Sequence, residues 1–218
     1  MSQLQSVQIE RFKAIVDAPI DLAELNVLVG ANNAGKSSVI QGLHFGVGLL
    51  QTILLSDNWT SGNSISTSLN PTQLIYSPSE SVNALAMGGK LLESIESAIK
   101  ISFVLGSGDQ CSVSVRKGRN RNILIAVENA RAAKRLASLE EPFTVFSPGL
   151  AGISKAEQFV SDGVLLRTIA RGDANLVLRN ILLRLWDKPE WEPFLADLHE
   201  IFPGLQFNVA FDNRTAVH

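Results

Sequence analysis

The sequence predicts an α/β fold with a mixed sheet, an antiparallel β subdomain and a helical C-terminal half. Three observations support this class. A short apolar run, "LNVLVG" at 25–30, leads through a glycine-containing loop into a helical pattern. Three alternating segments separated by turn sequences follow within residues 98–128. Residues 129–204 then carry mostly helical spacing of apolar residues.

Residues 1–55 are expected to hold strands, a loop and one helix. "LQSVQIERF" alternates apolar and polar residues, and "PIDLAEL" repeats the style, so both predict strands. "LNVLVG" is continuously apolar and ends in glycine, which is typical of a buried central strand. After Ser37 the apolar residues recur every three or four positions. Gly42, Gly46 and Gly48 either weaken this helix or let another element approach it closely.

Residues 56–97 read as an irregular excursion, because Ser, Thr, Asn and Pro are frequent between 56 and 81. The strand patterns "AIKISFVL", "QCSVSVRK" and "NILIAVEN" occupy 98–128, and the turns "GSGD" and "GRNR" between them predict an antiparallel meander. Cys111 in the second of these is interpreted as a buried strand cysteine.

The region 129–204 is expected to be helical. Ser154 and Glu157 form a capping-box pattern, so Glu157 is interpreted as a cap rather than a catalytic acid. Asp173 is expected to cap the next helix, and Pro189 to open the last one, which stops at "PG". "LQFNVAF" at 205–211 predicts a final strand.

Composition limits the class of protein without deciding it. The chain has 218 residues, 45% of them hydrophobic, and a formal net charge of -2, which gives no overall attraction to nucleic acid or membrane. A single cysteine excludes an intramolecular disulfide framework. The N-terminus lacks a signal-peptide core, and the most apolar run is too short for a membrane span. We therefore expect a soluble cytoplasmic protein.

The motif that carries chemistry is G-x-x-x-x-G-K-S, from Gly30 to Ser37. Between a strand and a helix, this spacing presents main-chain amides and a helix N-terminus to phosphate oxygens. Lys36, the one catalytic candidate, would place its charge between the β- and γ-phosphates, and the Ser37 hydroxyl would ligate Mg²⁺. The sequence thus predicts ATP and Mg²⁺ as ligands, with binding residues Gly30, Asn32, Asn33, Ala34, Gly35, Lys36, Ser37 and Ser38.

The first forty-five residues resemble the N-terminal head of SMC/RecF-class ABC ATPases, a class that includes OLD-type and related AAA-like ATPases of DNA repair and anti-phage defence. The resemblance rests on "VQIERFKAI" and on "PIDLAELNVLVGANNAGKSSVIQGL", which holds the Walker A loop. More weakly, "FTVFSPGLAGISKAEQ", "RGDANLVLRNILLRL" and "IFPGLQFNV" resemble later head segments. The resemblance implies a P-loop NTPase of ABC/SMC-head type.

Two further residues take roles from this resemblance. Lys13 matches the basic residue after the aromatic in the first turn, which implies a place near the nucleotide; a solvated turn lysine is the alternative. Gln73 lies where a Q-loop glutamine would contact Mg²⁺ or its water, although the sequence around it is not diagnostic.

Hydrolysis in this class needs a signature loop and an acidic strand, and neither pattern is found. Glu128 in "ILIAVEN" follows an apolar strand but lacks the Asp-Glu pair, so a strand edge is the better interpretation. The resemblance therefore implies the N-terminal part of a head, from a truncated chain or a split protein. Alone, it should bind ATP weakly and turn it over poorly. Its expected partner is a second copy or a missing C-terminal half.

Other charged residues leave alternatives open. "RKGRNR" at 116–121, with Arg131, Lys134 and Arg135, is either a contact for a DNA backbone or a solvated hairpin tip and helix face. No aromatic residues interleave with these charges, which favours the second interpretation. The three histidines show no metal-ligand spacing. The whole chain could also be a non-catalytic interaction module, in which a bound nucleotide only stabilises a surface for a partner.

Overall fold

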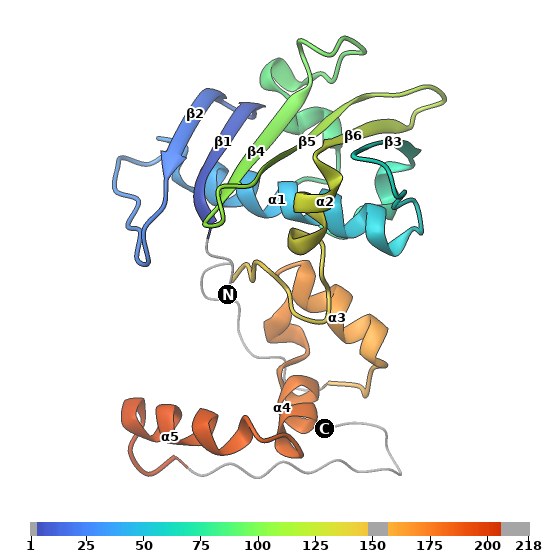
Figure 1. Ribbon diagram of the computed structural model, residues 1–218. Helices are drawn as coiled ribbons and strands as arrows, with labels where there is room; N and C mark the ends of the chain where they lie inside the picture. The colour runs from blue at the N-terminus through green and yellow to red at the C-terminus, as the bar shows by residue number, and fades with distance from the viewer. Residues whose placement is uncertain (1–3, 148–156, 206–218) are drawn as a thin grey trace. The chain divides into compact units, whose positions relative to one another are not determined.

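The computed structural model describes residues 4–147 and 157–205 and divides into two compact units, Met1–Val145 and Phe146–His218 (Figure 1). The first unit contains a β-sheet with one long helix against it. The second unit contains helices. The α/β class and the helical later half are therefore confirmed.

Six strands form the described sheet, in the order β2-β1-β4-β5-β6-β3 (Figure 1). Every neighbouring pair is antiparallel, so the predicted meander is confirmed, whereas a mixed sheet is wrong for the described residues. The strands are β1 Leu4–Phe12, β2 Ile15–Asp21, β3 Ser64–Leu69, β4 Ile99–Leu105, β5 Gln110–Lys117 and β6 Ile123–Glu128.

β3 lies inside the segment expected to be irregular. Its sequence, "SISTSL", is rich in serine, which hides the strand pattern because only two of its six residues are large and apolar. Both of these, Ile65 and Leu69, are buried, and they pair with Val127 and Ile123 of β6. β3 therefore forms because it pairs with an apolar neighbouring strand, and not because of its own β-strand propensity.

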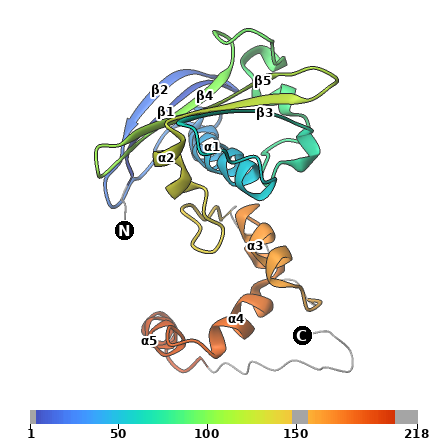
Figure 2. The ribbon, with the colours of Figure 1, turned by 45° about the vertical axis from the view of Figure 1, so that its right-hand side comes forward.

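The helix α1, Lys36–Leu55, packs across one face of the sheet, as Figure 2 shows with the sheet seen nearly edge-on. Its buried residues begin at Gly42, so the first turn protrudes beyond the core. A Cβ atom on Gly42 would lie 3.1 Å from Ile9, and one on Gly46 would lie 2.8 Å from the ring of Phe103. The glycines therefore allow close approach to the sheet, which is one of the two readings that the sequence left open.

The segment before the phosphate loop differs most from the prediction. Residues 25–30 were expected to form a buried central strand, but they form no strand, and their side chains are exposed, with Val27 at 74% and Val29 at 89%. A buried strand needs neighbours on both sides, and the six described strands pair only among themselves. The prediction of a central strand is therefore wrong for this structure.

Short helical turns connect the remaining parts of the first unit. They are η1 Pro71–Gln73, η2 Val82–Leu85, η3 Met87–Gly89, α2 Ala130–Ala133 and η4 Lys134–Leu136. The Thr52 hydroxyl of α1 donates to the carbonyl of Gly48 (2.7 Å) and accepts from the amide of Ile75 (3.0 Å). The chain after η1 is thus fixed against the second half of α1.

The second unit holds α3 Asp162–Ala170, η5 Ala174–Leu176, α4 Leu178–Trp186 and α5 Trp191–Ile201. Glu157 is a cap, but of another helix than expected: its carboxylate accepts the amides of Arg179 (2.9 Å) and Asn180 (3.2 Å) at the start of α4. The side chain of Asp173 forms no cap, and α5 begins two residues after Pro189. Ser154 and residues 206–211 of the expected last strand lie outside the described residues.

Of the helices in the described ranges, only α1 is long and apolar enough to cross a bilayer. Most of it is buried against the sheet, and burial in a core accounts for an apolar composition.

Candidate nucleotide-binding site

The phosphate-binding loop follows residues 25–29 and leads into α1. Asn33 (φ 67°) and Gly35 (φ 92°) both have left-handed backbone conformations, which asparagine and glycine adopt most easily. The Ala34 amide donates to the carbonyl of Ala31 (3.2 Å) and closes a tight turn. The loop is thus shaped by residues that tolerate positive φ.

Lys36 folds back over the loop that precedes it. Its ammonium donates to the carbonyls of Gly30 and Ala31, each at 2.7 Å. Because an ammonium group has three donors, one remains for a further acceptor. The positive charge is therefore held at the mouth of the loop by two main-chain oxygens.

No side chain of the first turn compensates the positive end of the helix dipole at the N-terminus of α1. Its cap residue, Gly35, has no side chain to satisfy the first amides, and the first turn contains no acidic residue. Ser37 is exposed in that first turn. Free amides, an ammonium and a hydroxyl together form a donor set that fits a polyphosphate with its Mg²⁺ ion.

Lys13 lies in the turn between β1 and β2, beside α1. Its ammonium donates to the side-chain oxygen of Gln41 (2.6 Å), and burial lowers its pKa. Gln41 follows Lys36 by five residues, about 7.5 Å along a helix. The preceding Phe12 is fully buried and stacks on Phe45, with 5.8 Å between ring centroids. The turn that carries Lys13 is thus anchored near the loop end of α1.

Gln73 is not brought to the loop. Its side-chain oxygen accepts the amide of Asn70 (2.9 Å) in a capping box at η1. Two residues later, Ile75 contacts Thr52, which follows Lys36 by 16 residues, or about 24 Å of helix. Gln73 therefore lies toward the other end of α1, with its acceptor already used, and its role in binding Mg²⁺ stays a prediction that this geometry does not favour.

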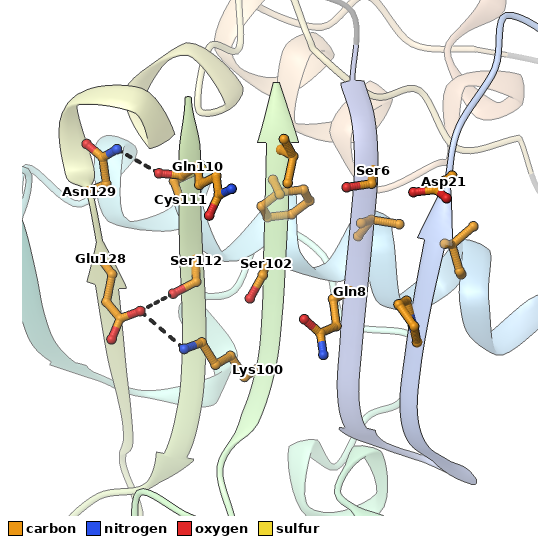
Figure 3. A pocket seen from close by; sticks show the side chains of 15 residues that line it. Ser6, Gln8, Asp21, Lys100, Ser102, Gln110, Cys111, Ser112, Glu128 and Asn129 are labelled. Carbon is orange, nitrogen blue, oxygen red and sulfur yellow. Dashed lines mark hydrogen bonds and ion pairs between the residues drawn. The ribbon is translucent and has the colours of Figure 1, made fainter. Parts of the chain in front are cut away.

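Glu128 lies on the face of the sheet opposite α1. It accepts hydrogen bonds from Ser112 (2.6 Å) and Lys100 (3.2 Å), and these bonds hold the pKa of Glu128 below its ordinary value. Figure 3 shows the three side chains together along a groove of about 430 Å³. Val127, on the inner face, is buried. The geometry thus agrees with a strand-end carboxylate that points away from the loop helix.

The basic cluster read from the sequence is divided by the fold. Arg116 donates to the Glu93 carbonyl (2.6 Å), and Arg135 pairs with Asp109 (3.5 Å). The hairpin tip and α2 lie at opposite ends of β6, about 20 Å apart at 3.3 Å per residue. The charges therefore do not form one patch. What the sequence did not reveal is that Trp59 lies in one pocket with Arg131 and Lys134, because that contact depends on the unpredicted strand β3.

The remaining candidate groups are structural. His44 is buried, with its ring 4.4 Å from that of Tyr76 and its Nδ1 2.9 Å from the Thr144 hydroxyl. Cys111 is buried as predicted, and burial raises the pKa of its thiol to about 11. Within residues 4–147 and 157–205, no group of His, Cys, Asp and Glu is arranged to hold a metal ion by itself.

Comparison with known proteins adds one match. The family model of the AAA ATPase domain matches residues 3–85, which include β1, β2, the loop, α1 and β3. A comparison with curated proteins finds no match. The matched segment, fewer than half of the 218 residues, indicates an AAA-like, nucleotide-binding ATPase domain.

Proposed function

We propose that this chain is the ATP–Mg²⁺-binding lobe of an ATPase of the SMC/RecF/OLD type, which acts on DNA in repair or phage defence. The observation that carries the proposal is the loop itself. Left-handed Asn33 and Gly35, an uncapped helix start and the tethered Lys36 converge on one exposed site. The AAA ATPase match supports the coarser assignment, and the resemblance of residues 7–43 supports the finer one.

Each loop residue has a separate task in this proposal. The amides after Asn33 bind the β-phosphate, and Lys36 neutralises charge between the β- and γ-phosphates. The Ser37 hydroxyl ligates Mg²⁺, which screens the phosphate charge when bound. Lys13 lies one and a half turns along α1 and contributes a second positive charge beside the loop.

Hydrolysis by this lobe requires groups from elsewhere. Glu128 points away from the loop helix, and the exposed segment 25–29 has no strand beside it among the described residues. We infer that a second copy, or a further polypeptide, supplies the acidic strand and signature loop, with ATP bound between two heads. On this view the lobe binds ATP alone and turns it over only in the assembly.

The site is tested by nucleotide binding. We expect Lys36→Ala to weaken the affinity for a fluorescent ATP analogue with Mg²⁺ at least about tenfold, because it removes a charge-assisted hydrogen bond. Lys90→Ala, which removes an exposed lysine from another part of the unit, is the matched control. A thermal midpoint shared by all three proteins would show that folding is intact. Equal affinity of Lys36→Ala and wild type would reject the site.

A second candidate is a non-catalytic module in which nucleotide only stabilises a docking surface. The exposed apolar segment 25–29, directly before the loop, favours it, because occupancy of the loop would alter the neighbouring segment. A steady-state ATPase assay separates the two candidates. Turnover that depends on Lys36, with this chain alone or with its partner added, would contradict the module.

A further inference from the structure

A second small pocket lies between the loop that follows α1 and the start of α2, apart from the phosphate loop. Its volume is about 190 Å³. Aromatic, hydroxyl, amide and cationic side chains line it: Trp59, Thr60, Ser61, Asn63, Arg131 and Lys134. The residues are distant in sequence, and the fold brings together 59–63 with 130–134.

Two main-chain contacts fix this pocket. Ser64 at the start of β3 pairs with Glu128 at the end of β6, so the chains on either side of that pair must be neighbours. The amide of Ala130 then donates to the Asn63 carbonyl (2.8 Å). Both contacts lie at the same end of the β3–β6 pair. Main-chain hydrogen bonds of the sheet therefore hold the two loops of the pocket together.

The two cations of the pocket are available for an outside partner. Arg131 and Lys134 are three residues apart, so they lie on the same side of the helical turn, and both are exposed. Neither forms an ion pair with another residue of the described chain, in contrast to Arg135, which pairs with Asp109. Their charges are therefore uncompensated beside the half-buried indole of Trp59.

We propose that this pocket binds single-stranded nucleic acid. Arg131 and Lys134 contact phosphodiester oxygens, and one unpaired base stacks on Trp59. A positively charged surface with an adjacent aromatic ring is the arrangement that binds single strands without reading their sequence. The hydroxyls of Thr60 and Ser61 offer further donors to the backbone. The proposal does not depend on ATP binding at the phosphate loop.

Size and accessibility argue against other ligands. A pocket that encloses a small molecule is roughly 300–1,000 Å³, so about 190 Å³ suits part of a longer polymer better than a whole nucleotide. In a duplex the bases are stacked and their faces are covered, so an indole reaches them only in an unpaired strand or end. The combination thus favours a single strand over a duplex.

The test is fluorescence anisotropy with a labelled oligothymidylate, using the full chain without ATP. We expect Trp59→Ala to weaken binding about 5- to 140-fold, because loss of one stacked base costs about 1–3 kcal/mol. Trp59→Phe keeps an aromatic face and should retain most of the affinity. The double variant Arg131→Ala with Lys134→Ala should make the affinity less dependent on salt. The negative slope of log affinity against log salt should become shallower by about 1.4, or about 0.7 for each lost phosphate contact.

Arg119→Ala with Arg121→Ala is the matched control, because it removes the same charge from the hairpin tip at the other end of β6. We expect it to change affinity by less than about twofold, since contacts there lie outside the pocket. A decrease in tryptophan fluorescence on binding, absent in Trp59→Phe, would place the base on this indole.

Three results would overturn the proposal. They are equal binding by Trp59→Ala and wild type, equal or tighter binding of a duplex of the same length, and competition by inorganic phosphate at equal concentration. Lys36→Ala should bind the oligonucleotide as wild type does. The proposed nucleic-acid site and the proposed ATP site can therefore be rejected independently of each other.

Discussion

Gly35 shows at the scale of one residue how the loop is made. Its φ of 92° is in the left-handed region, and a Cβ added there would meet no atom within 4 Å. Glycine is therefore required at this position by the left-handed backbone conformation and not by a lack of space. Asn33, with φ 67°, is the other left-handed residue of the loop, and asparagine tolerates that region better than most residues.

We expect Gly35→Ala to weaken the binding of an ATP analogue about tenfold, because a left-handed alanine costs about 1–2 kcal/mol and the loop would relax out of its phosphate-binding shape. The thermal midpoint should change little, since the loop is on the surface. Gly163→Ala is the control: no atom lies near its Cβ, and it sits in the first turn of α3 with a negative φ. Wild-type affinity of Gly35→Ala would show that the left-handed conformation is not needed for binding.

At the scale of one element, α1 serves both core and site. Its residues from Gly42 onward are mostly buried against β1, β4 and β5, whereas its first turn projects beyond the sheet and carries Lys36 and Ser37. The rigid, buried part therefore holds the exposed part in place. Glycine is unfavourable inside a helix by about 1 kcal/mol relative to alanine, so Gly42 and Gly46 are explained by packing.

Gly46→Ala should destabilise the protein by about 1–3 kcal/mol despite the higher helix propensity of alanine. The new Cβ would lie 2.8 Å from Phe103 and 2.9 Å from Ile101, both fully buried, so the sheet or the helix must shift. Urea unfolding followed by circular dichroism measures the change. Gly163→Ala again serves as the control, with a neutral or slightly stabilising effect. A neutral Gly46→Ala would mean that α1 can move away from the sheet at no cost.

At the scale of the whole molecule, the apolar segment 25–29 of the first unit pairs with no strand of the described residues. Leu25 is 82% exposed, Val27 74% and Val29 89%, and no described strand pairs with the main chain there. Unpaired amides and carbonyls next to apolar side chains favour pairing with another chain. The segment joins directly to the candidate phosphate loop, so such pairing would bring a partner close to the proposed nucleotide site.

We expect this chain alone to self-associate as its concentration rises, and Val27→Lys with Val29→Lys to reduce that association. Both side chains are largely exposed, so the double variant should keep the wild-type thermal midpoint. Sedimentation velocity at several concentrations measures the effect. Ile95→Lys, which replaces an exposed apolar residue elsewhere, is the control and should leave association unchanged. Equal association of the double variant and wild type would show that residues 25–29 are not the contact.

The sequence by itself determined the elements whose pattern is local. Alternation in β1, β4, β5 and β6 and the three- to four-residue spacing in α1 were sufficient to predict them, because each buries one regular face. The sequence also predicts a phosphate loop, because glycine, lysine and serine at this fixed spacing match what a phosphate requires.

Tertiary structure alone decided where non-local partners meet. The apolar run at 25–30 is indistinguishable in sequence from a central strand, yet none of the strands within residues 4–147 and 157–205 pairs with it. β3 forms because β6 offers it an apolar edge, and that pairing brings Trp59 to Arg131 and Lys134. Likewise, Glu157 accepts the amides at the start of α4, a helix that begins 21 residues later in the sequence. Hydrogen bonds and burial between distant segments leave no periodic trace in either one, so only the folded chain reveals them.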